Sequence, residues 1–309
     1  MRASKKVLVI DDEDGIASAI KDYLEEEDYV VTVAGNGQTG LDLAIEEKPD
    51  LILLDVGLPD MNGYEVCQKI RAVPELKYTP VIMLTAYTRE KDEVTGFSVG
   101  ADDYVAKPFK PVALLARIQT AIGRNRRELD ANSLTHLPGN MSIIQEIEAR
   151  IATKGPLSVL HFDLNSFKAF NDRYGFVRGD AAIKLTAEIL GKSFAGLGTG
   201  AFLGHVGGDD FVGVLNFFEA GPVCEGIIKE FDSRIPGLYD EEDRRRRAIV
   251  SYDRRGNKVE LPIMGLAIAV VTNRQKTFAH PGEIALIAGD LKKWVKSEIR
   301  SAYVVDRRT

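Results

Sequence analysis

The sequence predicts an α/β protein of two domains, the first of which is a doubly wound parallel sheet. The chain has 309 residues, which is enough for two domains that each bury a core of their own. In the first half, short apolar segments rich in β-branched residues alternate with segments of helical periodicity, as in repeated βα units. Carboxylates follow several of these apolar segments directly, and ligands bind beyond the carboxyl ends of the strands in such sheets.

Four strands and three helices are expected in the first half. The predicted strands are short and apolar, as buried parallel strands are, and comprise residues 5–10, 50–54, 80–84 and 103–106. The predicted helices are residues 15–27, 40–47 and 63–73. In the first helix, apolar side chains recur at the spacing of one helix face: Ile16, Ile20, Tyr23 and Leu24.

Five polar side chains end these strands or follow them closely: Asp11, Asp12, Asp55, Thr85 and Lys107. We expect them to converge at one edge of the sheet. Three carboxylates at one place repel one another unless a cation neutralises them, so Asp11, Asp12 and Asp55 are predicted ligands of Mg²⁺. With the metal and Lys107 withdrawing charge from an incoming phosphoryl group, Asp55 can attack it and Thr85 can donate a hydrogen bond to the new phosphate. A single Asp at a strand end is often a helix cap, but the five residues together favour the phosphate site.

The segments VLVIDDE, LILLDVGLPDMNGYE, VIMLTAY and ADDYVAKPF resemble the response regulator receiver family over about residues 5–122. The resemblance implies that a sensor histidine kinase phosphorylates Asp55 and that Thr85 and Tyr104 reposition as a switch, with Lys107 beside the phosphate. It also suggests a cis peptide bond between Lys107 and Pro108.

A connecting helix is predicted from Pro111 to about Leu134, because apolar residues recur at helical spacing before the segment becomes polar and charged. Such a helix is a rigid spacer, so a rearrangement of a receiver dimer would move the domain attached to it.

The second half contains a predicted strand at residues 157–164 and a predicted hairpin at 202–215, with a tight turn at Gly207–Asp210 where paired glycines permit positive φ. If the hairpin pairs beside the strand that contains Asp163, then Asp163 and Asp209 meet and can hold one or two Mg²⁺ ions over a triphosphate. Residues 165–172 are predicted to form a short loop whose amides, with Lys168, hold phosphates.

Two further polar residues suggest a purine base as the ligand. A carboxylate that accepts hydrogen bonds from two ring N–H groups, supported by an amide, selects guanine over adenine, and Asp180 and Asn171 can form this pair.

The segments LTHLPGN (134–140), FDLNSFKAFNDRYGFVRGD (162–180) and VGGDDF (206–211) resemble the GGDEF domain of diguanylate cyclases, an α/β domain of nucleotidyl-cyclase-like fold. That family condenses two GTP molecules into cyclic di-GMP, each 3′-hydroxyl attacking the α-phosphate of the other nucleotide, and two domains must face each other. The resemblance implies these roles: Asp163 and Asp209 as metal ligands, Asp209 and Asp210 as the catalytic signature acids, Lys168 as a phosphate contact, and Asn171 and Asp180 as guanine contacts. Lys296 and Arg300 fall where the family places phosphate-binding residues, although a solvated helix face is an equal alternative.

The predicted order is therefore a receiver domain at residues 1–122, a helical linker at 123–132 and a GGDEF domain at 133–309, with a homodimer formed on phosphorylation. The family's inhibitory RxxD motif would fall at Gly198–Ala201, whose sequence lacks it, so phosphorylation is the expected control.

Several residues depart from the family pattern: Asn165 for the second acid of DxDxFK, Phe176 for a common His, His205 for an Arg before the signature, His136 for a Gly, and Asp210 for the usual Glu. Asp is one methylene shorter than Glu, so a carboxylate that must reach a metal or hydroxyl can lose its productive position. A catalytically weak or inactive domain that acts as a GTP-binding or protein-interaction module is the alternative hypothesis.

Composition restricts the partners and the compartment. A net charge of −6 argues against binding nucleic acid, and the longest apolar stretch, Ile263–Val271, is far shorter than the roughly 20 residues of a membrane-spanning helix. The N-terminal segment lacks the pattern of a secretory signal, so a cytoplasmic protein is expected. Cys67 and Cys224 are predicted to be partly buried thiols. Residues 236–262 are predicted to end a helix and form a hairpin, either a charged sheet edge or a docking surface.

Overall fold

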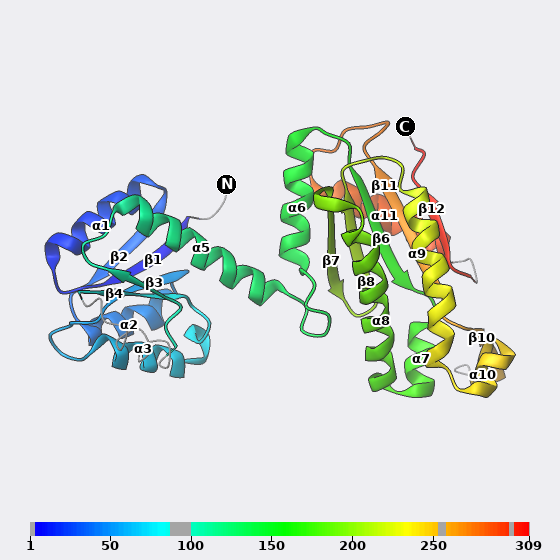
Figure 1. Cartoon of the computed structure of the whole chain (residues 1–309), viewed down its shortest axis with the longest axis horizontal. Helices are drawn as coiled ribbons and strands as arrows, with labels where there is room; N and C mark the ends of the chain where they lie inside the picture. Colours follow the sequence, from blue (N-terminus) through cyan, green and yellow to red (C-terminus); the bar gives the residue numbers. More distant parts are fainter. Residues whose placement is uncertain (1–3, 87–99, 253–257, 297–299, 309) are drawn as a thin grey trace. The chain divides into compact units, whose positions relative to one another are not determined.

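The computed structural model describes residues 4–86, 100–252, 258–296 and 300–308, and the chain divides into two compact units, Met1–Leu129 and Asp130–Thr309 (Figure 1). None of the helices within the described residues is long and apolar enough to cross a membrane.

The first unit is a parallel five-stranded sheet in the order β2-β1-β3-β4-β5. Its elements are β1 (Lys5–Ile10), α1 (Asp14–Glu26), β2 (Tyr29–Ala34), α2 (Gly37–Glu47), β3 (Leu51–Asp55), α3 (Gly63–Ala72), the short 3-10 helix η1 (Pro74–Leu76), β4 (Val81–Thr85), β5 (Asp103–Ala106) and α5 (Pro111–Asp130). The predicted doubly wound sheet is confirmed, and each of the four predicted strands lies within one residue of an observed one. Strand β2 is additional and forms an edge of the sheet.

Burial explains why this sheet takes helices on both faces. All residues of β3 and β4 are buried, as expected for central strands covered on two sides. Alternate residues of β1 point to opposite layers, since Val7 and Val9 pack with α1 and α5, whereas Leu8 and Ile10 pack with α2 and α3. This packing fixes the directions of the strands and so places the residues that follow them at one edge.

The second unit is a five-stranded sheet in the order β12-β11-β6-β8-β7, in which only the β11–β12 pair is parallel. Its elements up to the central hairpin are α6 (Asn140–Thr153), β6 (Ser158–Leu164), α7 (Phe167–Tyr174), α8 (Phe176–Ala195), η2 (Gly198–Gly200), β7 (Ala201–Gly207) and β8 (Asp210–Leu215). The remaining elements are α9 (Gly221–Arg234), η3 (Ile235–Leu238), α10 (Glu241–Arg246), β9 (Ala248–Tyr252), β10 (Lys258–Pro262), β11 (Leu266–Thr272), α11 (Pro281–Val295) and β12 (Ala302–Val305).

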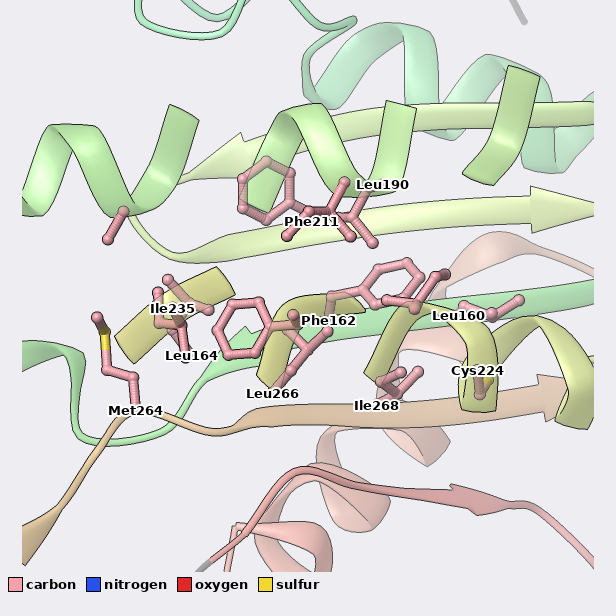
Figure 2. Close-up of a cluster of buried hydrophobic side chains, with 14 of the residues drawn as sticks. Leu160, Phe162, Leu164, Leu190, Phe211, Cys224, Ile235, Met264, Leu266 and Ile268 are labelled. Carbon is pink, nitrogen blue, oxygen red and sulfur yellow. The ribbon is translucent and has the colours of Figure 1, made fainter. Parts of the chain in front are cut away.

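Packing in the core of this unit shows which side of the sheet each residue of β6 faces. Figure 2 shows Leu160, Phe162 and Leu164 in one cluster with Leu190 of α8 and Cys224 of α9. The alternate residue Val159 packs instead with residues of α6 and α11. Because side chains alternate along a strand, Asp163 lies on the α11 side of the sheet.

Two sequence predictions are wrong, one for a segment of this unit and one for the cysteine of each unit. Residues 165–172, predicted as a loop, enter helix α7 at Phe167, because Phe170 is fully buried in the core and anchors the segment. Cys67 and Cys224, predicted to be partly buried, are both fully buried in apolar clusters.

Two other predicted segments can be located. Strands β9 and β10 pair as the predicted antiparallel hairpin, whose turn at 253–257 lies outside the described residues. The predicted linker, residues 123–132, falls mainly within α5, which ends at Asp130.

Candidate phosphorylation and nucleotide sites

The acidic residues of the first unit meet at the edge of its sheet. Asp11 follows β1 and Asp55 ends β3, and ligand oxygens of Asp11, Asp12 and Asp55 all lie within 4.8 Å of one another. The Lys107 ammonium lies 2.8 Å from Asp11 Oδ2 and 2.9 Å from Asp55 Oδ1. The predicted convergence therefore occurs, and the oxygen-only donor set fits a hard divalent ion.

Opposing effects act on the ionisation of this cluster. Burial raises the pKa of Asp11 above its ordinary value, although the hydrogen bond from Lys107 acts in the other direction. Burial alone would lower the pKa of Lys107, but its bonds to Asp11, Asp55 and Glu13 outweigh burial and raise this pKa. Lys107 thus stays charged. Glu13, 3.0 Å from Lys107, was not among the predicted site residues, and its place three residues after β1 was the available signal.

The predicted switch residues lie on the neighbouring strands. Thr85 is the buried last residue of β4, and its carbonyl accepts a hydrogen bond from the Lys107 amide at 2.7 Å. Tyr104 is half-buried on β5, directly opposite Met83 of β4. The bond between Lys107 and Pro108 is cis, as the resemblance suggested.

The signature turn of the second unit joins β7 to β8. Gly207 and Gly208 have φ of 144° and 58°, the positive values predicted for the paired glycines. Strand β8 runs antiparallel to β6 with Asp210 directly opposite Asp163, so hairpin pairing brings the signature beside the buried carboxylate of β6.

Lys292 of α11 and Lys296, which directly follows this helix, neutralise these carboxylates. Lys292 Nζ lies 2.8 Å from Asp163 Oδ2 and also contacts Asp210 Oδ1, while Lys296 Nζ lies 2.7 Å from Asp163 Oδ1. Burial raises the pKa of Asp163, but the hydrogen bonds from the two lysines outweigh it and leave this pKa lowered. The pKa of Asp209 is raised, first by burial and then by the charge of Asp163.

The donor set here differs from that of the first unit. Within the described part of the chain, only Asp11, Asp12 and Asp55 form a group of three metal-binding side chains, although Asp163, Asp209 and Asp210 are all described. Ammonium groups occupy both oxygens of Asp163. The site thus combines carboxylates, which can bind a metal ion, with ammonium groups, which can bind phosphate. This combination suits a ligand that carries both a metal ion and phosphate.

The residues predicted to contact guanine lie on two consecutive helices. Asn171 is on α7 and Asp180 is on α8, where it is exposed. Asn171 Oδ1 is buried and has no hydrogen-bond partner among the described residues. A side chain at Gly179 would place its Cβ 1.9 Å from Asn171 Oδ1, so glycine is required where α8 crosses this amide. Lys168, on the first turn of α7, and Arg300 are both exposed.

Comparison with known families assigns both halves. Residues 7–119 match the family model of the response regulator receiver domain, and residues 130–231 match that of the GGDEF domain, described as diguanylate cyclase. The chain contains a receiver domain followed by a GGDEF domain. Residues 232–309, including Lys292 and Lys296, lie beyond the second match.

Individual proteins are similar to part of this chain. The transcriptional regulatory protein SrrA of Staphylococcus aureus is 42% identical over 133 residues, which are 43% of this chain and 54% of SrrA. The chain thus spans about half the length of the curated relatives it matches. A CheY-like receiver domain protein from Methanospirillum hungatei is 32% identical, covering 41% of this chain and 99% of its own at a TM-score of 0.39. Chemotaxis protein CheY4 of Vibrio cholerae is 34% identical, covering 38% and 99% at a TM-score of 0.38.

In the GGDEF domain, His205 connects the signature turn to the segment at the domain's start. Its Nδ1 lies 2.9 Å from Thr135 Oγ1, its Nε2 lies 3.0 Å from the Gly208 carbonyl, and its ring stacks on Phe211 at 4.2 Å. Burial lowers the pKa of His205 and favours the neutral ring, although the hydrogen bond to the Gly208 carbonyl and the charge of Asp210 act in the other direction. His136, in the same starting segment, adopts a φ of 57°, which explains why glycine suits that position.

A buried carboxylate from the segment 236–262 holds the end of α7. Asp243 of α10 accepts a hydrogen bond from the Tyr174 hydroxyl, and Arg173 Nε lies 3.4 Å from the same oxygen. Tyr174 also packs against Phe170 and Tyr239, with ring centroids 4.9 and 5.6 Å away. Residues 236–262 therefore support the helix that carries Asn171, a role that the sequence did not reveal.

Proposed function

We propose that the chain is a two-component response regulator in which a sensor histidine kinase phosphorylates Asp55 and thereby controls a diguanylate cyclase. The GGDEF domain would bind one GTP, and phosphorylation would favour a homodimer in which two GTP-loaded domains face each other. Each 3′-hydroxyl oxygen would attack the α-phosphorus of the other nucleotide, forming cyclic di-GMP and releasing two pyrophosphates.

The receiver half of the proposal is supported by the carboxylates beside Lys107. Asp11, Asp12 and Asp55 would hold Mg²⁺, which when bound offsets the charge of an incoming phosphoryl group. Lys107 already lies 2.9 Å from Asp55, so its ammonium is in place to contact a phosphate on that residue. Thr85, at the end of the next strand, would donate to the same phosphate.

A single arrangement supports the output half of the proposal. Sheet pairing sets Asp210 opposite Asp163, Lys292 contacts both carboxylates, and Lys296 contacts Asp163. Acidic groups for a metal and basic groups for phosphate thus meet at the signature turn. Asp163 and Asp209 would hold Mg²⁺, while Lys168, Lys296 and Arg300 would contact phosphates.

Base selection would come from the two helices beside this turn. The Asp180 carboxylate would accept hydrogen bonds from guanine ring N–H groups, and Asn171 would complete the pairing. Asn171 Oδ1 is buried and finds no donor in the described part of the chain, which supports this role, because such a group costs free energy until a donor reaches it.

The experiment is mass analysis of products after incubation of the full chain with GTP and Mg²⁺, with and without beryllofluoride. Cyclic di-GMP should form, and beryllofluoride should increase its rate in the unaltered chain but not in Asp55→Asn. No product at any protein concentration would end the claim of catalysis, and equal rates with and without beryllofluoride would end the claim of control.

A second function is a GGDEF domain that binds GTP without turning it over and signals through a protein partner. It is favoured by Asp210, which is shorter than the usual Glu and already ion-paired with Lys292. In this case GTP affinity would fall on Asp180→Ala, and neither the unaltered chain nor Asp210→Glu would yield product. Product from Asp210→Glu alone would instead assign the inactivity to the shortened side chain.

A further inference from the structure

Lys292 takes a position on α11 that its helix otherwise uses for the core. The buried residues of α11 are Ile284, Ala288 and Val295, so Lys292 follows Ala288 by four residues and precedes Val295 by three. This spacing places it on the same helix face. Its side chain is 21% exposed, whereas that of the adjacent Lys293 is 83% exposed. Lys292 therefore points toward the sheet.

The ammonium of Lys292 bridges two strands. It contacts Asp163 of β6 and Asp210 of β8, which lie opposite each other in the sheet. Asp163 is only 2% exposed, so its charge needs a nearby cation. Lys296 contacts the other oxygen of Asp163 from a more exposed position.

We propose that Lys292 is a built-in counter-cation of the signature site, which competes with a divalent metal ion for the carboxylate of Asp163. An ion that binds Asp163 Oδ2 has to displace the ammonium, and the chain thus supplies one of the positive charges that the site requires. The shorter acid at position 210 is consistent with this arrangement, since its carboxylate is already paired with the lysine.

This inference rests on the proposed nucleotide site, but it concerns metal binding alone and is tested without nucleotide. The test uses the full chain carrying Asp11→Asn and Asp12→Asn, which removes two of the three carboxylates of the receiver metal site. Binding of Mn²⁺ is measured from the electron paramagnetic resonance signal of the free ion, for this chain and for the same chain with Lys292→Met. Lys293→Met, the neighbouring exposed lysine, is the matched control.

Removing Lys292 should tighten Mn²⁺ binding by roughly tenfold or more, because the ion no longer has to break hydrogen bonds between charged groups. Lys293→Met should change the affinity less than about twofold, since removing an exposed charge has little effect. Unchanged or weaker Mn²⁺ binding in Lys292→Met would overturn the proposal, as would the absence of Mn²⁺ binding in both chains. The outcome of these titrations does not depend on whether the chain makes cyclic di-GMP, so the two proposals can fail separately.

A second measurement keeps Lys292 and so does not depend on how its variant folds. In the metal-free chain, the Lys292 ammonium should give a lysine ¹H–¹⁵N NMR signal that is protected from exchange with water. Adding Mg²⁺ should abolish that protection as the ion displaces the ammonium. A signal that stays protected when Mg²⁺ binding is complete would refute the competition.

Discussion

Replacing Tyr174 by Phe removes the hydroxyl that donates a hydrogen bond to Asp243, a carboxylate that is 2% exposed. The ring keeps its contacts with Phe170 and Tyr239, so the change isolates the hydroxyl. Arg173, at 3.4 Å, does not replace the lost donor, because its own side chain is about half exposed. A hydrogen bond to a charged group contributes about 1.5–3 kcal/mol, so the free energy of unfolding of the GGDEF domain should fall by about 2 kcal/mol.

The single tryptophan makes this loss measurable in the full chain. Trp294 lies on α11, so its fluorescence during urea unfolding reports on the GGDEF domain rather than on the receiver. Tyr303→Phe is the matched control, because the Tyr303 hydroxyl donates to Glu225 at 3.0 Å but on the exposed surface. That variant should lose less than about 1 kcal/mol.

A double-mutant cycle tests the assigned partner. If Tyr174 acts through Asp243, the effect of Tyr174→Phe should depend on that carboxylate. The loss of unfolding free energy caused by Tyr174→Phe should be smaller by at least about 1 kcal/mol in an Asp243→Asn background than in the unaltered chain. Fully additive losses, or equal losses for Tyr174→Phe and Tyr303→Phe, would refute the reasoning.

Three further outcomes are expected. Lys107→Met should destabilise the receiver by about 3–5 kcal/mol, because the buried Asp11 carboxylate loses its cation. The loss should be seen as faster amide hydrogen exchange in β3. Unchanged exchange rates would contradict this. Since burial lowers the pKa of His205, the folded domain favours the neutral ring; the stabilisation is complete above pH 6.5 and is lost as pH falls through the lowered pKa. The urea concentration at the unfolding midpoint, measured by Trp294 fluorescence, should therefore decrease as the pH is lowered below 6.5. The decrease should be less steep in His205→Gln. Cys67 and Cys224 should react with a thiol reagent only after unfolding, since both are fully buried and burial raises both pKa values; native labelling would be inconsistent with that.

The receiver site was predictable because strand periodicity and sheet topology act together. Once β1 and β3 are recognised as buried parallel strands, the residues at their carboxyl ends must share an edge, and Asp11 and Asp55 follow without further information. Strand β2 was missed although YVVTVA is rich in β-branched residues. It is an edge strand in which Val30 is exposed and Thr32 half-buried, so its pattern is less uniformly apolar than those of its neighbours.

The second site could not be predicted fully from the sequence, because it depends on how helices pack against the sheet, which periodicity does not determine. A lysine at position 292 is read from sequence as a solvated residue, and only the rotation of α11 against the sheet turns it toward Asp163. The sequence signals were its spacing of four residues from Ala288 and Lys296 and of three from Val295, and they could not say which face the helix buries. The helical start of α7 was missed for a similar reason, because it depends on Phe170 entering a core formed by distant strands.

The start of the GGDEF domain is bound to its signature by consecutive polar contacts. Asp130, the last residue of α5, accepts hydrogen bonds from the amides of Met141 and Ser142 at 2.8 Å, so it also caps α6. Asn132 then accepts from the Thr135 amide at 3.1 Å, and the Thr135 hydroxyl meets His205, whose ring reaches the Gly208 carbonyl. A displacement of the end of α5 therefore has to move α6 or break these bonds, whereas a flexible linker would dissipate it. Within the second unit, Asp130 at the end of α5 is thus connected through these residues to the turn that carries Asp209.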